Sequence, residues 1–170
     1  MTYPQLQILN SKETAKILEM LKEQFGITEI SGKIIQRGAE RLFLYQGSFT
    51  KEKIKEIEQT IPIERIGVYF AKIVPGEEGI RLSIDGTHIF KNQITKNIFE
   101  LTDKQAEVYL KGEELQLKTP EQEKGFKVIK YKNDFWGCGK ASSEKISNFI
   151  PKQRRVKLGR NTIIIQKEED

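Results

Sequence analysis

Cysteine and histidine are almost absent from this sequence, and the shortage limits its chemistry. The 170 residues contain one cysteine, Cys138, and one histidine, His88. A single cysteine excludes an intramolecular disulfide and favours a reducing compartment. Zinc sites need several Cys, His or carboxylate ligands at suitable spacing, so we expect no metal site.

Patterns that hold nucleotides or activate nucleophiles are also missing. Phosphate-binding loops place glycines between a strand and a helix, whereas the Gly-Cys-Gly run at 137–139 lies between strand-like residues. A reactive thiolate needs a base, and nothing in the sequence brings His88 to Cys138. We therefore expect no cofactor and no catalytic residue. Cys138 is interpreted as a small buried residue and His88 as a structural histidine.

Long apolar runs are lacking as well. No run approaches the roughly 18 residues of a membrane span, and no N-terminal apolar region precedes a small-residue cleavage site. The sequence predicts a soluble cytoplasmic protein with no membrane partner.

Positive charge, by contrast, is abundant in one stretch, residues 125–160. It holds ten Lys and Arg against two acidic residues, a net charge of +8, while the whole chain carries +5 and the remainder −3. Aromatic and glycine residues lie between the cations, a pattern typical of surfaces that meet a phosphate backbone. The alternative is a solvated surface with strands beneath it.

The hydrophobic pattern predicts an α+β protein. A helix is expected from Asn10 to Phe25, a hairpin over 33–46, and a second short helix over 50–59. We expect residues 1–60 to form a small α+β N-terminal domain.

Short strands dominate residues 61–170. A capping box, Thr102 to Gln105, begins a helix that Gly112 ends. Residues 61–170 are therefore expected to form a small, partly closed β barrel with short helices. Its predicted strands cover 66–73, 80–84, 126–131, 135–140, 145–150 and 162–166.

Cations and amides near residue 150 are the candidates for nucleic-acid binding. Lys152, Arg154 and Arg155 follow a proline that constrains the local backbone. Arginine contacts a phosphate bidentately, and Asn148 or Gln153 can read a base edge. The aromatic side chains of this region are assigned to the core instead: Phe126, Trp136 and Phe149.

Several short motifs, in a fixed order, resemble those of one family. They are Tyr-Leu-Lys-Gly-Glu at 109–113, Lys-Gly-Phe-Lys-Val at 124–128, Gly-Cys-Gly-Lys at 137–140, and the run at 145–155 that contains Asn148 and ends in Arg-Arg. Over about residues 60–160 the chain resembles the C-terminal PUA-like RNA-binding domain of RsmF-type RNA cytosine methyltransferases, the Fmu/Sun group. In form it is similar to stand-alone archaeal ribosome biogenesis proteins of this group.

The resemblance implies a PUA-like pseudobarrel that binds RNA, with ribosomal RNA or its precursor as the expected partner. A methyltransferase or a ribosome assembly factor is a further expected partner. The S-adenosylmethionine domain and catalytic Cys motifs of the enzymes have no counterpart in this sequence, so we expect a non-catalytic protein. The expected RNA-binding residues are Lys111, Gly112, Lys140, Lys145, Asn148, Lys152, Gln153, Arg154 and Arg155.

Two other functions remain open at this stage. The protein could be a protein-interaction adaptor that targets a separate RNA methyltransferase through its acidic N-terminal part. The third possibility is that the protein is a small enzyme, in which case its activity would depend on Cys138 or His88.

Overall fold

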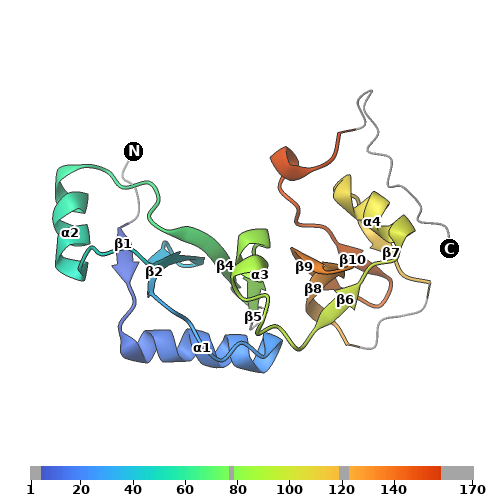
Figure 1. Cartoon of the computed structure of the whole chain (residues 1–170), viewed down its shortest axis with the longest axis horizontal. Coiled ribbons are helices and arrows are strands. Elements are labelled where there is room, and N and C mark those ends of the chain that lie inside the picture. Colours follow the sequence, from blue (N-terminus) through green and yellow to red (C-terminus); the bar gives the residue numbers. More distant parts are fainter. Residues whose placement is uncertain (1–4, 77–78, 119–122, 158–170) are drawn as a thin grey trace.

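The computed structural model describes residues 5–76, 79–118 and 123–157, and these residues form two five-stranded sheets. Figure 1 shows the first sheet towards the N-terminus, the second towards the C-terminus, and helix α3 between them. Helices and strands are both abundant and a sheet curls into half a barrel, so the predicted α+β class is confirmed. None of the helices in these described residues is long and apolar enough to cross a membrane.

The first sheet is an antiparallel meander in chain order. Helix α1 (Ser11–Phe25) packs on one face, and helix α2 (Lys51–Thr60) packs on part of the other. The hairpin predicted over 33–46 is confirmed as the second and third strands. The strands are β1 (Leu6–Ile8), β2 (Lys33–Arg37), β3 (Arg41–Tyr45), β4 (Val68–Val74) and β5 (Gly79–Leu82).

Helix α1 begins and ends where its sequence predicts. The Asn10 side chain accepts a hydrogen bond from the Glu13 N–H, and the Glu13 carboxylate accepts one from the Asn10 N–H. This capping box satisfies two N–H groups that have no partner inside the helix. Gly26, at φ 82°, ends the helix in the left-handed conformation that glycine adopts readily.

The second sheet has the strand order β6-β8-β9-β10-β7. Strand β6 runs parallel to β8, and the other neighbouring strands are antiparallel. Helix α4 (Asp103–Leu110) begins at the predicted Thr102–Gln105 capping box and covers one face of the sheet. The strands are β6 (Ile98–Glu100), β7 (Leu115–Gln116), β8 (Gly125–Tyr131), β9 (Asp134–Ala141) and β10 (Lys145–Ser147).

A shared hydrophobic core joins the two sheets. Val128 of β8 and Cys138 of β9 are buried in the same cluster as Leu21 and Phe25 of α1. Side chains alternate between the two faces of a strand, so Ile129, next to Val128, points to the other face and packs with α4. The second sheet therefore has one face buried against the first sheet and the other against α4.

The first sheet continues past residue 60, where the sequence predicts the end of the N-terminal domain. Leu42 of β3 lies opposite Ala71 of β4, and Ala71 lies opposite Leu82 of β5. The two strands predicted to begin the barrel thus pair with the first sheet. The chain passes from this sheet towards the second through helix α3 (Ile84–Ile89).

Helix α3 occupies residues that the sequence assigned to the end of a strand and a turn. The Ser83 hydroxyl accepts a hydrogen bond from the Gly86 N–H at 2.9 Å and caps the helix. Gly86 is required there, because a Cβ would overlap the backbone of Phe70 in β4. The buried face of this short helix is formed by Gly86 and Thr87, whereas Ile84 is half-buried and Ile89 is exposed.

The C-terminal strands are also shorter than expected. The strand predicted over 145–150 ends at Ser147, and the strand predicted over 162–166 lies outside the described residues. Phe149 is 38% exposed, so its assignment to the core is wrong, whereas Phe126 and Cys138 are buried as predicted. Phe149 is exposed because the chain leaves the sheet before it and is no longer held between the two layers.

Candidate nucleic-acid interface

The described part of the basic stretch forms β8, β9, β10 and the short 3-10 helix η1 (Lys152–Arg154). Several of its cations meet carboxylates of the same chain, so the charge count overstates the positive charge that is free for a ligand. Four ion pairs have N–O distances between 2.7 and 3.3 Å: Lys127–Glu123, Lys130–Glu100, Lys145–Glu114 and Arg154–Asp85.

The Asn148 side chain, predicted to read a base, is occupied by the protein's own backbone. Its Nδ2 donates to the carbonyl oxygens of Tyr109 and Glu113 at 2.6 and 2.9 Å. Its Oδ1 accepts from the Ile150 N–H at 2.9 Å. These bonds tie the end of α4 to the segment that follows β10. Asn148 therefore shapes the candidate interface, and its amide has little capacity left for a base.

Gly112 and Arg155 make a second connection between α4 and this segment. Gly112 has φ 88°, and a Cβ at this position would overlap the Arg155 side chain. The Arg155 Nε donates to the Ile150 carbonyl at 2.9 Å, and the Val156 N–H donates to the Leu110 carbonyl at 2.9 Å. The glycine thus lets Arg155 lie across the end of α4, where the arginine holds the backbone.

Helix η1 presents the exposed members of the predicted set. Lys152, Gln153 and Arg154 are all exposed, and Pro151 immediately precedes them. The Arg154 guanidinium donates to both oxygens of Asp85 in α3, at 3.1 and 3.0 Å. Because half of this ion pair remains open to water, a phosphate can compete for the arginine at modest cost.

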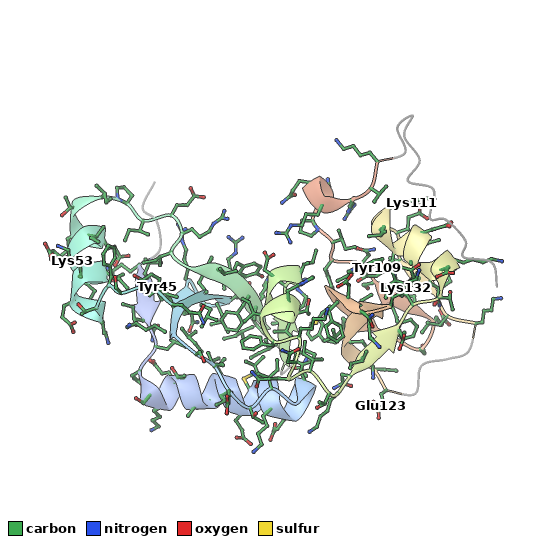
Figure 2. All side chains as sticks on the ribbon, viewed as in Figure 1. Tyr45, Lys53, Tyr109, Lys111, Glu123 and Lys132 are labelled. Atoms are coloured by element: carbon green, nitrogen blue, oxygen red, sulfur yellow. The ribbon has the colours of Figure 1, made fainter. Side chains whose placement is uncertain are left out.

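Two further predicted lysines lie at the end of α4 and in strand β10. Figure 2 shows Lys111 at the outer end of α4, while Tyr109 lies on the side of the helix that faces the sheet. Lys145 of β10 pairs with Glu114 at 2.7 Å beside β7. Lys111 therefore lies next to Gly112, whereas Lys145 shares a sheet face with Lys140, because Ser147, two residues after Lys145, lies opposite Lys140.

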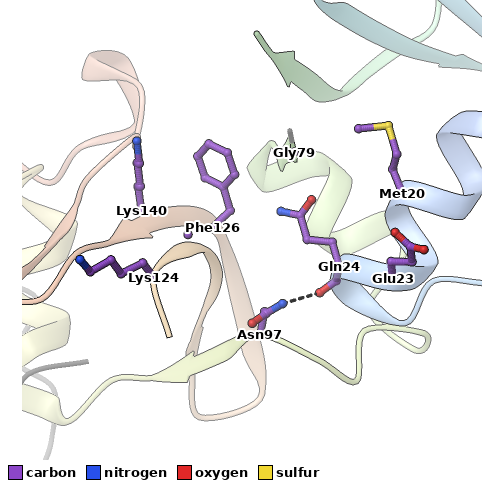
Figure 3. A pocket seen from close by; sticks show the side chains of 9 residues that line it. Met20, Glu23, Gln24, Gly79, Asn97, Lys124, Phe126 and Lys140 are labelled. Carbon is purple, nitrogen blue, oxygen red and sulfur yellow. Dashed lines mark hydrogen bonds between the residues drawn. The ribbon is translucent and has the colours of Figure 1, made fainter. Parts of the chain in front are cut away.

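Lys140 of β9 lines a pocket of about 520 Å³ between α1 and the second sheet. Figure 3 shows Lys140, Lys124 and Phe126 on one wall, with Met20, Glu23 and Gln24 of α1 on the other. Asn97 closes one end, and its Nδ2 donates to the Gln24 carbonyl at 2.7 Å. The pocket carries both signs of charge, from Glu23 and from the lysines.

A further cleft, of about 370 Å³, lies between the two sheets, and we call it the inter-sheet cleft. Its first-sheet side includes three arginines that the sequence analysis missed: Arg41, Arg65 and Arg81. They lie in the part of the chain with a net negative charge, and pairing of distant strands brings them together. The second-sheet side includes Trp136, Phe149, Pro151, Gln153 and Arg154.

The potential catalytic residues are in unfavourable environments. Burial raises the pKa of the Cys138 thiol to about 12, so the thiol is protonated near neutral pH. His88, interpreted as a structural histidine, is exposed on α3. Within the described residues, no group of three or more His, Cys, Asp or Glu side chains is placed to hold a metal ion.

Comparisons with known proteins match the second sheet to one family. Residues 96–156, which contain β6 to β10 and η1, match the family model described as the methyltransferase RsmF PUA domain. Two similar proteins are named ribosomal RNA small subunit methyltransferase F. The protein of Psychromonas ingrahamii is 25% identical over 153 residues, and that of Shewanella piezotolerans is 25% identical over 143 residues.

These matches cover most of this chain but a minor part of each relative. They include 89% and 84% of this chain, and 30% and 28% of the relatives, so the chain spans less than a third of their length. The match also extends beyond residues 60–160, in which the motifs were found. Residues 96–156 match the PUA domain of the RsmF group, and the resemblance predicted from the sequence motifs is confirmed.

Proposed function

We propose that this protein binds RNA without catalysing a reaction, and that ribosomal RNA or its precursor is its ligand. One observation carries the proposal: residues 96–156, which match the PUA domain of an rRNA methyltransferase family, contain the exposed polar helix η1. The relatives are named for methylating small-subunit rRNA, which supports a role in rRNA modification or ribosome biogenesis.

The proposed RNA contacts centre on η1. Lys152 and Arg154 contact phosphates, and Gln153 between them supplies an amide for a base or a sugar. Lys111, Lys140 and Lys145 add positive charge around the second sheet. Gly112, Asn148 and Arg155 hold the backbone that presents η1, and we assign them a supporting role.

Two features favour a non-catalytic function. The family model that matches describes the PUA domain of the methyltransferase rather than its catalytic part. Cys138 is buried with a raised pKa, which disfavours the thiolate that a cysteine nucleophile requires.

RNA binding can be measured with a transcript of small-subunit rRNA over a range of salt concentrations. The test variant is Lys152→Ala/Arg154→Ala, and Lys152→Ala/Arg154→Ala/Arg155→Ala extends it. A matched control, Lys12→Ala/Lys16→Ala, removes two exposed lysines from α1, on the far face of the first sheet. Circular dichroism melting establishes that each variant is folded.

Counterion release gives the expected size of the effect. The slope of log K against log salt is negative, and each lost phosphate contact reduces its magnitude by about 0.7–0.9. Loss of two contacts should weaken binding roughly 25- to 60-fold at 0.1 M salt and reduce the magnitude of the slope by about 1.4–1.8. Folded test variants that keep the affinity and salt slope of the control would refute the assignment to η1. A wild-type protein that binds no rRNA would refute the function.

The second candidate function is an adaptor that targets a separate RNA methyltransferase. It is favoured by three large apolar side chains, Phe49, Ile61 and Val68, which are the most exposed of their kind in the described residues at 47%, 55% and 46%. All three lie in or beside the connections on either side of α2. Affinity purification from a native lysate separates the candidates. A stoichiometric protein partner that survives nuclease treatment would favour the adaptor, and its absence would favour direct RNA binding.

A further inference from the structure

We propose that the inter-sheet cleft binds the phosphate backbone of a single RNA strand through arginines of the first sheet. This inference rests on the proposed function, because it assumes that the protein binds RNA. It adds a contact surface outside residues 96–156, where the resemblance to the PUA domain lies. The RNA would then lie against both sheets rather than against the second sheet alone.

A row of three cations crosses the first sheet. Arg41 of β3 lies opposite Lys72 of β4, and Lys72 lies opposite Arg81 of β5. Residues directly opposite in antiparallel strands project from the same face, and like charges at such positions are destabilising. Lys72 has a counter-charge in Glu40, at 2.7 Å. The row therefore keeps an excess of positive charge that an anionic ligand would relieve.

The lining of the whole cleft carries a positive charge. Arg41, Arg65, Arg81 and Arg154 line it, against the single carboxylate of Asp85, so the formal charge of its lining is +3. Asp85 is already paired with Arg154. Neither Arg41 nor Arg65 has an ion pair within the described residues, although both are exposed. A cleft lined by one sign of charge concentrates ligands of the opposite sign.

One arginine of the cleft is already held in place by an aromatic ring. The Arg81 guanidinium lies over the Phe149 ring, 4.2 Å from its centroid. This cation–π contact restricts the arginine while its planar edge keeps hydrogen-bond donors for a phosphate. Phe149 belongs to the second sheet's C-terminal segment and Arg81 to the first sheet. The contact therefore places an arginine between the two sheets.

The size of the cleft favours a single strand. Its volume of about 370 Å³ is near the lower end of the roughly 300–1,000 Å³ typical of small-ligand pockets. Such a space admits about one nucleotide unit of an extended chain. The half-buried side chains of Trp136 and Tyr69 give the cleft aromatic surface suited to an unpaired base.

The test compares two variants that lose the same charge. Arg41→Ala/Arg65→Ala/Arg81→Ala removes the first-sheet arginines of the cleft, and Lys12→Ala/Lys16→Ala/Lys22→Ala removes three exposed lysines of α1. Binding is measured with the small-subunit rRNA transcript and with an oligouridylate, at several salt concentrations. We expect the cleft variant to bind each RNA roughly 100-fold more weakly than the α1 variant does at 0.1 M salt. The magnitude of its salt slope should be smaller by about 2.

A single substitution guards against misfolding of the triple variant. Arg65 lies in the loop before β4, is exposed, and forms no ion pair in the described part of the chain. Arg65→Glu is therefore expected to melt like the wild type. Loss of one phosphate contact lowers the affinity for RNA about 5-fold at 0.1 M salt. The charge reversal should therefore weaken RNA binding by at least about 5-fold.

The outcomes separate this inference from the function on which it rests. If the wild type binds no RNA, the proposed function fails and this inference with it. If the wild type binds RNA and the cleft variants bind as tightly as the α1 control, the cleft is not an RNA site and the proposed function stands. Polyglutamate serves as an acidic polypeptide probe. If it binds through these arginines and RNA does not displace it, the inference is overturned in favour of a protein partner.

Discussion

Alanine at position 148 should destabilise the protein without directly removing an RNA contact. The Asn148 amide makes three hydrogen bonds, to the carbonyls of Tyr109 and Glu113 and from the N–H of Ile150. Alanine removes all three and leaves the Tyr109 carbonyl, in a partly buried position, without this donor. The change therefore acts on the connection between α4 and η1.

The expected loss follows from the environment of each bond. A hydrogen bond of this kind contributes about 0.5–1.5 kcal/mol net, so three together contribute roughly 2–4 kcal/mol. The Glu113 carbonyl is in an exposed position and can take a water instead. We therefore expect Asn148→Ala to lower the free energy of unfolding by about 2–3 kcal/mol. With a urea m-value of about 2–3 kcal/mol/M, the unfolding midpoint falls by about 1 M.

Urea unfolding followed by circular dichroism measures this shift. Gln153→Ala is the control, because Gln153 is exposed and its side chain has no hydrogen bond in the described residues; it should change stability by less than about 0.5 kcal/mol. Asn148→Asp keeps the acceptor for Ile150 but puts a carboxylate against two carbonyl oxygens, so it should be at least as destabilising at neutral pH. An Asn148→Ala protein of wild-type stability that binds RNA more weakly would refute this reasoning and restore Asn148 as a base-reading residue.

Two further predictions concern the core and the end of α4. Gly112→Ala should lower stability by about 1–3 kcal/mol in thermal melting, since alanine is strained at φ 88° and its Cβ overlaps Arg155; an unchanged melting temperature would contradict the contact. Burial raises the pKa of Cys138 to about 12, so above about pH 9 the unfolded chain releases the thiol proton and the folded chain keeps it. Stability should therefore fall between about pH 8 and pH 10 more steeply for the wild type than for Cys138→Ala, measured by urea unfolding. Equal slopes would mean that the thiol is accessible to water.

The local elements of the fold could be predicted because their signals are contiguous in sequence. The Asn10–Glu13 and Thr102–Gln105 capping boxes mark the beginnings of α1 and α4, and Gly26 marks an end. Helix α3 was missed because it is short and its Ser83 cap lies inside the alternating apolar run at 80–84, which also fits a strand. The division of the chain between sheets was not predictable in the same way. It depends on β4 and β5 pairing with β3, a choice among strands distant in sequence.

The candidate interface, too, could be predicted from the sequence only in part. Charge and motifs indicated the segment around η1, and η1 is exposed. They did not show that Asn148 and Arg155 bond to the backbone, since their partners lie at the end of α4 and at Ile150. The first-sheet arginines left no signal, because each is an isolated cation in an acidic region of the sequence.

The sequence by itself determined the positions of the caps and turns, the concentration of positive charge near residue 150, and the order of the family's motifs. These properties depend on residues that are close in the sequence, so they do not depend on how the rest of the chain folds. The tertiary structure alone decided which cations face a common space and which are neutralised. Arg41, Lys72 and Arg81 become neighbours only when three strands align, and Phe149 meets Arg81 only when the two sheets pack. Charge acts over distances in space, so a site made of charges is fixed by the folded arrangement.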